Sequence, residues 1–90
     1  MANQRDQNLV TSSRSGIVTT DGVMVEVCIV RLENEKQWTL EVVNAAGTST
    51  VWDETFPSDD VAYAEFQRTV ADEGIQTFLD QGNVVPFKRR

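Results

Sequence analysis

Four carboxylates lie close together where a predicted strand gives way to a predicted helix: Asp53, Glu54, Asp59 and Asp60. Carboxylate oxygens are the ligands that Mg²⁺ and Ca²⁺ prefer, so this acidic junction is a candidate cation site. However, the chain contains no D-x-[DN]-x-[DN]-G loop, and adjacent strand residues point to opposite faces, which separates Asp53 from Glu54. Helix capping and solubility explain these acids better than a cation does. We therefore expect neither a metal nor a cofactor.

Nucleophilic catalysis is the other chemistry to consider. The chain has one cysteine, Cys28, and no histidine, so its hydroxyl and thiol groups lack their usual activating base. Cys28 stands between Val27 and Ile29 with Glu26 nearby, a setting that should raise the pKa of its thiol. No phosphate-binding glycine loop and no C-x-x-C pair occurs. We predict a non-enzymatic protein in which Cys28 fills apolar space.

Net charge of −6 is unevenly distributed. Residues 21–82 carry thirteen acids against three bases, whereas the two ends together carry five bases against one acid. An acidic body repels phosphate backbones, which disfavours it as a nucleic-acid-binding surface. The basic cluster Lys88-Arg89-Arg90 leaves weak nucleic-acid binding through the tails as one alternative. A second alternative is an acidic decoy that mimics nucleic acid and occupies the site of a basic partner.

The elements that must position these residues are four strands and a helix. Apolar and β-branched periodicity predicts strands at residues 16–20, 23–32, 37–44 and 48–55. Asp21-Gly22 fits a two-residue type I′ turn, and Ala45-Ala46-Gly47 fits a three-residue hairpin loop closed by a glycine with positive φ. The order predicts an antiparallel meander sheet.

The register of this sheet follows from its turns. A loop at Asn34 and Glu35 places Ile29 opposite Leu40 and Val27 opposite Val42, so the apolar stripes of both strands share one face. The next hairpin pairs Leu40 with Trp52, which should make Trp52 a core anchor.

A helix follows the sheet. Pro57 ends the last strand, Ser58 can cap the helix, and Asp59 and Asp60 suit the positive end of its dipole. We predict a helix over residues 59–73 that ends at Gly74, and a helical turn over 75–80. The predicted inward positions are Val61, Ala62, Phe66, Val70 and Ala71. The fold class is α+β: a disordered leader over residues 1–15, a single domain over 16–82 and a flexible tail over 83–90.

One face of this sheet is more apolar than a solvated surface should be. The helix is expected to cover the face of Trp52, and the opposite face then holds Met24, Cys28, Val30, Leu32, Val43 and Val51. Such a surface is typical of a contact site, so these six residues are candidate partner-binding residues. A homodimer is one expectation, because a chain of 90 residues buries a small share of its surface. The alternative is that the ends of the chain cover this face.

The predicted function is protein–protein interaction, with a protein partner or a second copy of the chain. The first fifteen residues lack the apolar core of a secretory signal, and no stretch approaches the roughly 18 apolar residues of a membrane span, so we expect a cytoplasmic protein. Small size alone favours a bacterial source or a mobile element. We identify no small-molecule site from the sequence.

Overall fold

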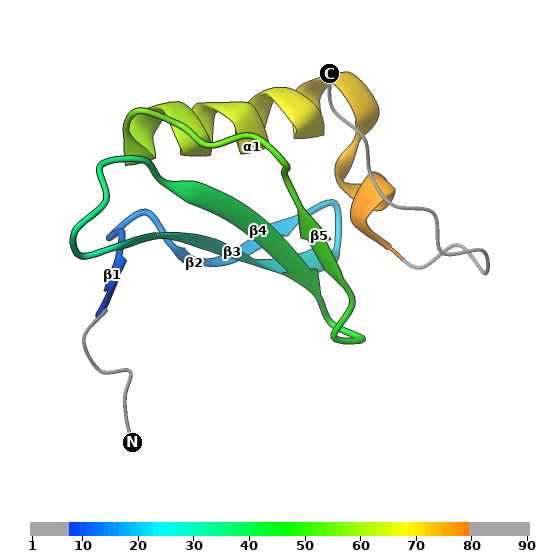
Figure 1. The fold of residues 1–90 in the computed structure, drawn as a ribbon. Coiled ribbons are helices and arrows are strands. Elements are labelled where there is room, and N and C mark those ends of the chain that lie inside the picture. The colour runs from blue at the N-terminus through cyan, green and yellow to red at the C-terminus, as the bar shows by residue number, and fades with distance from the viewer. Residues whose placement is uncertain (1–7, 80–90) are drawn as a thin grey trace.

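A five-stranded antiparallel sheet covered on one face by a helix and a 3₁₀ turn makes up the structure (Figure 1). The computed structural model describes residues 8–79. Its elements are β1 (Leu9–Thr11), β2 (Gly16–Thr20), β3 (Val23–Leu32), β4 (Thr39–Asn44), β5 (Ser49–Val51), α1 (Asp59–Glu73) and η2 (Ile75–Phe78). The predicted α+β class and the meander of β2 to β5 are confirmed, and β1 is an additional strand.

Strand β3 is the centre of the sheet. One of its edges pairs with β4, which in turn pairs with β5. Its other edge is shared by two short strands: β2 pairs with the first half of β3, and β1 pairs with its end, where Leu9 lies opposite Leu32. Together β1 and β2 therefore act as one strand interrupted at residues 12–15.

The predicted registers and the turns at Asp21-Gly22 and at Gly47 are confirmed, whereas residues 33–38 join β3 to β4 in place of the predicted two-residue loop at Asn34 and Glu35. Asp21 and Gly22 have φ values of 52° and 78°, the two positive values that a type I′ turn requires. Gly47 closes the next hairpin with a φ of 92°. Val27 and Ile29 pair with Val42 and Leu40, and the Trp52 N–H donates to the Leu40 carbonyl at 3.2 Å. The apolar stripes therefore share one face, as the sequence pattern predicts.

Two predicted strands are shorter than expected. β4 begins at Thr39 and not at residue 37, and β5 ends at Val51 and not at residue 55. Beyond β5, Trp38 and Phe56 form an isolated bridge through two backbone hydrogen bonds of 2.8 and 2.9 Å. The β4–β5 register would instead place Trp38 opposite Glu54, so the chain contains two extra residues before Phe56. Residues 53–55 therefore leave the ladder, because Asp53 and Glu54 are exposed acids with low strand propensity.

The prediction of a disordered leader over residues 1–15 is wrong for residues 8–15. These residues form β1 and a turn held by polar contacts: the Ser12 N–H donates to the Ile29 carbonyl at 2.9 Å, and the Ser15 Oγ accepts from the Ile29 N–H at 3.0 Å. Composition suggested disorder because Ser, Asn and Gln are common in disordered chains, whereas the contacts that order this segment are made with β3, which is distant in the sequence. Residues 1–7 and the predicted tail at 83–90 lie outside the described residues.

Helix α1 has the predicted ends. The Ser58 Oγ accepts from the Val61 N–H at 3.1 Å, and the Gly74 N–H donates to the Val70 carbonyl at 2.8 Å. Gly74 has a φ of 85°, which disfavours side chains and stops the helix. The following turn is a 3₁₀ helix that ends at Phe78, before the predicted limit at residue 80.

The inward face of α1 differs in part from the prediction. Ala62 and Phe66 are buried as predicted, but Val61 and Ala71 are exposed, and Thr69 is fully buried instead. Thr69 satisfies its hydroxyl by donating to the Glu65 carbonyl at 2.9 Å, so a polar residue can occupy a core position.

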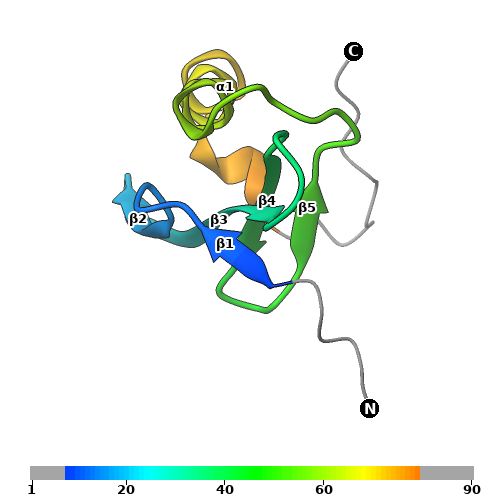
Figure 2. The same ribbon diagram turned by 60° about the vertical axis from the view of Figure 1, so that its left-hand side comes forward.

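The core lies between the sheet and the two helical elements (Figure 2). The Phe78 ring lies 6.1 Å from the Trp52 ring and 5.9 Å from the Phe66 ring. Asn44 is buried at the end of β4, where its Nδ2 donates to the Phe78 carbonyl at 2.9 Å while its Oδ1 accepts from the N–H groups of Ala46 and Thr48. One side chain thus ties η2 to the β4–β5 hairpin.

Candidate functional site

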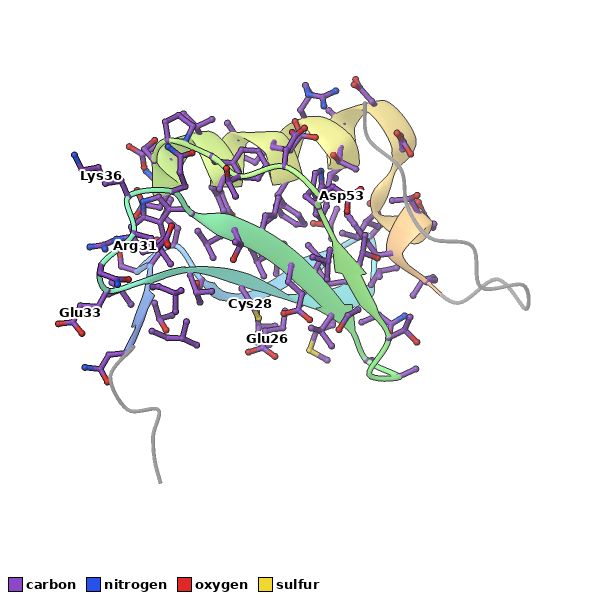
Figure 3. All side chains as sticks on the ribbon, viewed as in Figure 1. Glu26, Cys28, Arg31, Glu33, Lys36 and Asp53 are labelled. Carbon is purple, nitrogen blue, oxygen red and sulfur yellow. The ribbon has the colours of Figure 1, made fainter. Side chains whose placement is uncertain are left out.

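The face of the sheet that points away from α1 and η2 is the candidate site, which we call the open face. Strand registers place the following residues on it: Leu9, Thr11, Ile17, Thr19, Met24, Glu26, Cys28, Val30, Leu32, Thr39, Glu41, Val43, Ser49 and Val51. Figure 3 shows Glu26 and Cys28 pointing to the side opposite α1. Both described helical elements pack on the other side of the sheet, so no element of residues 8–79 covers this face.

Exposed apolar side chains concentrate on the open face. Of the six large apolar residues that are strongly exposed within residues 8–79, four belong to it: Leu9 at 63%, Ile17 at 61%, Val51 at 53% and Met24 at 49%. The other two, Val61 and Leu79, lie on α1 and just after η2. A gathering of this kind is more informative than single exposed residues, because contiguous exposed apolar area is typical of contact surfaces in general.

All six candidate residues named from the sequence lie on the open face, where Cys28, Val30, Leu32 and Val43 are half-buried. The sequence prediction missed Leu9 and Ile17. Leu9 belongs to the supposed leader, whereas Ile17 follows from the Asp21-Gly22 turn, which pairs it with Glu26.

Two carboxylates lie in the middle of the open face. Glu26 pairs across strands with Val43, and Glu41 pairs with Cys28 on one side and Val51 on the other. None of the residues that the registers place on this face is a lysine or arginine. Burial raises the pKa of the Cys28 thiol, and the charges of Glu26 and Glu41 raise it further. The predicted direction of this pKa shift is confirmed.

A shallow hollow lies at the β1 end of the open face. It has a volume of about 170 Å³, and its lining combines open-face residues with residues of the neighbouring loops and strand ends: Leu9, Val30, Arg31, Leu32, Glu35, Gln37, Thr39 and Thr55. Sites for small molecules typically measure about 300–1,000 Å³. The hollow therefore suits one side chain of a partner better than a cofactor.

The acidic junction does not form one site. The Ser12 Oγ donates to Asp59 Oδ2 at 2.7 Å, and the Arg14 Nε donates to Asp60 Oδ1 at 2.5 Å. These contacts tie the turn between β1 and β2 to the start of α1. Asp53 and Glu54 are instead exposed on the irregular segment before Phe56. Among the described residues, no three side chains of His, Cys, Asp or Glu are grouped as a metal ion would require.

Three arginines of the described chain have structural contacts. Arg14 lies 5.6 Å from the centre of the Tyr63 ring in addition to its pair with Asp60. Arg31 donates to the carbonyls of Leu32, Glu33 and Glu35 and lies 5.1 Å from the Trp38 ring. Arg68 pairs with Glu65 and Asp72, and its hydrogen bond to Glu65 is the main cause of its raised pKa. Residues 8–79 carry twelve acids against four bases, so their negative charge dominates the surface.

Comparisons of this chain with family models, with curated proteins and with solved structures found no match. Neither helix within residues 8–79 combines the length and apolar character that crossing a membrane requires.

Proposed function

We propose that this protein is a non-enzymatic interaction module that binds a protein segment through the open face. The observation that supports this proposal is the gathering of Leu9, Ile17, Met24 and Val51, each about half exposed or more, on one side of the sheet. Covering these side chains would remove apolar surface from water. Each Å² of apolar surface buried in this way stabilises a complex by roughly 25 cal/mol. We further propose that the module is cytoplasmic, because that compartment keeps a free cysteine such as Cys28 reduced.

The charges of the open face define the chemistry of the partner. Glu26 and Glu41 stand among apolar residues with no base on the same face. A partner that buried them with apolar groups alone would leave two desolvated anions, which is costly. A segment that alternates apolar side chains with lysine or arginine would instead pair with both glutamates while covering the apolar residues.

Self-association is less compatible with these charges. In a symmetric face-to-face dimer, the same patch is used on both copies, so two sets of Glu26 and Glu41 would enter one interface. Like charges brought together cost free energy, and none of the residues that the registers place on the open face is a cation that could offset them. We therefore propose a basic, apolar partner segment, and expect the protein to have the mass of a monomer in light scattering.

A library of displayed random peptides tests the proposal without knowledge of the natural partner. We expect selected peptides to combine apolar residues with Lys or Arg. Their affinity should fall at least tenfold for the double variant Ile17→Ser/Val51→Ser and for Glu26→Lys/Glu41→Lys. Since Ile17 and Val51 are exposed, the first variant should fold normally, which circular dichroism can verify.

Matched controls separate the open face from other surfaces. Val61→Ser removes an exposed apolar side chain from α1 and should leave peptide affinity unchanged. Asp53→Lys/Glu54→Lys applies the same charge reversal to two exposed acids outside the open face. If this second control weakens binding as much as Glu26→Lys/Glu41→Lys does, the protein is an acidic decoy and the open-face proposal is wrong. Failure to select any peptide would also contradict it.

A further inference from the structure

We propose that residues 83–90 of this same chain are a ligand of the open face and compete with the external partner. This inference rests on the proposed function, because it assigns a regulator to the same surface. The sequence of this segment, NVVPFKRR, lies outside the described residues.

The segment has the chemistry that the open face requires. It joins three apolar residues, Val84, Val85 and Phe87, to the basic run of residues 88–90. No other stretch of the chain places apolar residues directly beside three consecutive bases. The described residues have twelve acids and four bases, whereas residues 83–90 have three bases and no acid, so the two parts attract each other.

The described chain ends in a place from which this segment can reach the open face. The Phe78 carbonyl accepts from Asn44 Nδ2 at 2.9 Å, so the last described residues lie beside the end of β4. Val43, the next residue along β4, lies on the open face opposite Glu26. Residues 80–82 can span about 10 Å when extended, and Gly82 permits a turn.

The remaining length is also sufficient. Eight extended residues span about 26 Å, most of the roughly 33 Å length of the ten-residue strand β3. Glu41 lies two residues from Val43 on β4, about 7 Å along the strand, and is therefore well within this span. With Val84 over Val43, Lys88 follows four residues later, about 13 Å along the strand, from where its side chain can reach back toward Glu41.

Because residues 83–90 are attached to the same chain, even a weak contact with the open face can compete with an external ligand. A short flexible connection corresponds to an effective concentration of about 1 mM. If the free segment bound with a Kd of about 0.1 mM, the tethered segment would occupy the face about 90% of the time and reduce the affinity for another ligand about tenfold. Truncation at Gly82 should therefore raise the affinity for a library-selected peptide by about that factor.

Nuclear magnetic resonance of the full chain and of a chain that ends at Gly82 tests the contact directly. We expect amide signals of the open-face strands to differ between the two, with Val43 and Glu26 among those that shift. Adding a synthetic peptide of residues 83–90 to the truncated chain should restore the shifts in a saturable manner. A peptide with Glu in place of Lys88, Arg89 and Arg90 should not, and Glu26→Lys/Glu41→Lys should recover binding of that acidic peptide.

Each outcome decides between the two proposals. Unchanged open-face signals after truncation would overturn the role of residues 83–90, and the library peptides would still test the open face itself. If truncation shifts these signals but no library peptide binds either chain, the segment is an internal cover and the proposed function fails. A dimeric mass for the full chain that becomes monomeric on truncation would show exchange between copies, and would overturn the proposed contact within one chain.

Discussion

Trp52 connects the two layers of the fold through a single side chain. It is 3% exposed, contacts the Phe78 ring on η2, and donates from its indole Nε1 to Glu65 Oε2 on α1 at 3.0 Å. Sequence periodicity predicts its core position through the pairing with Leu40, but not the hydrogen bond, because Glu65 is distant in the sequence and its position depends on how the helix packs.

The substitution Trp52→Ala should lower the free energy of unfolding by about 3–5 kcal/mol, since it removes a large aromatic side chain from the core. Urea denaturation followed by circular dichroism measures this loss. Trp52→Phe is the matched control, because it keeps most of the apolar contact and loses the bond to Glu65, for a cost of about 1 kcal/mol beyond the smaller ring. A loss below about 1 kcal/mol for Trp52→Ala would contradict the core assignment.

Cys28 reports on the charges of the open face. Its thiol pKa is raised first by burial and then by Glu26 and Glu41, so replacing Glu41 with Gln should lower this pKa. Thiolate absorbance followed during a pH titration should therefore rise at lower pH in Glu41→Gln than in the unmodified chain. Glu54→Gln, which removes an exposed acid outside the open face, should leave the titration unchanged. An unchanged titration in both variants would show that Glu41 does not act on the thiol.

The sign of the linked stability effect follows from the same shift. Because folding raises the thiol pKa, the folded state holds this proton more tightly than the unfolded state does. Stability is therefore unaffected well below the ordinary thiol value of 9.0, and declines as the pH rises above it. Cys28→Ser should remove this part of the alkaline loss.

At the scale of elements, the interrupted strand formed by β1 and β2 is the least expected feature. Between β1 and β2, the Ser15 hydroxyl takes the place of a strand backbone as the hydrogen-bond partner of Ile29. It accepts from the Ile29 N–H at 3.0 Å and lies 3.2 Å from the Ile29 carbonyl. Ser15→Ala should leave this N–H without its protein partner and cost about 1–3 kcal/mol in urea denaturation. Ser13, exposed in the same turn, is the matched control, and Ser13→Ala should change stability by less than about 0.5 kcal/mol. Equal effects of the two variants would contradict this role of Ser15.

Local signals account for the parts of the fold that the sequence predicts well. Asp21-Gly22, Ala45-Ala46-Gly47, Ser58 and Gly74 each determine a backbone geometry within a few residues, and the strand registers and helix ends follow from them. The open face follows in turn, because alternation assigns each strand residue to a side.

The features that the sequence did not predict depend on contacts between distant segments. β1 has only three residues and forms because β3 is long enough to pair with it beyond β2. Ser12 is buried because Asp59, 47 residues away, accepts its hydroxyl hydrogen. Neither contact has a local pattern, so composition alone made these residues look disordered. Leu9, part of the candidate site, was missed for this reason.

At the scale of the whole molecule, excess negative charge opposes folding. Residues 8–79 carry twelve acids, and three of their four bases already make contacts within the fold. Mutual repulsion of the remaining acids destabilises the compact state, because folding brings them closer together. Salt screens this repulsion, since the Debye length falls from about 30 Å at 0.01 M to about 8 Å at 0.15 M.

Raising the ionic strength over this range should therefore increase the melting temperature by roughly 1–3 °C, the size expected when surface charge effects of a few tenths of a kcal/mol are relieved in a small domain. Differential scanning calorimetry measures this change.

Asp53→Asn/Glu54→Gln should raise the melting temperature at low salt and reduce its salt dependence, because both acids are exposed and contribute to the repulsion. Asp60→Asn should instead lower the melting temperature at low salt, because Asp60 pairs with Arg14. If both variants raised it equally, the pair that ties the β1–β2 turn to α1 would contribute nothing to stability, and total charge alone would determine the salt response.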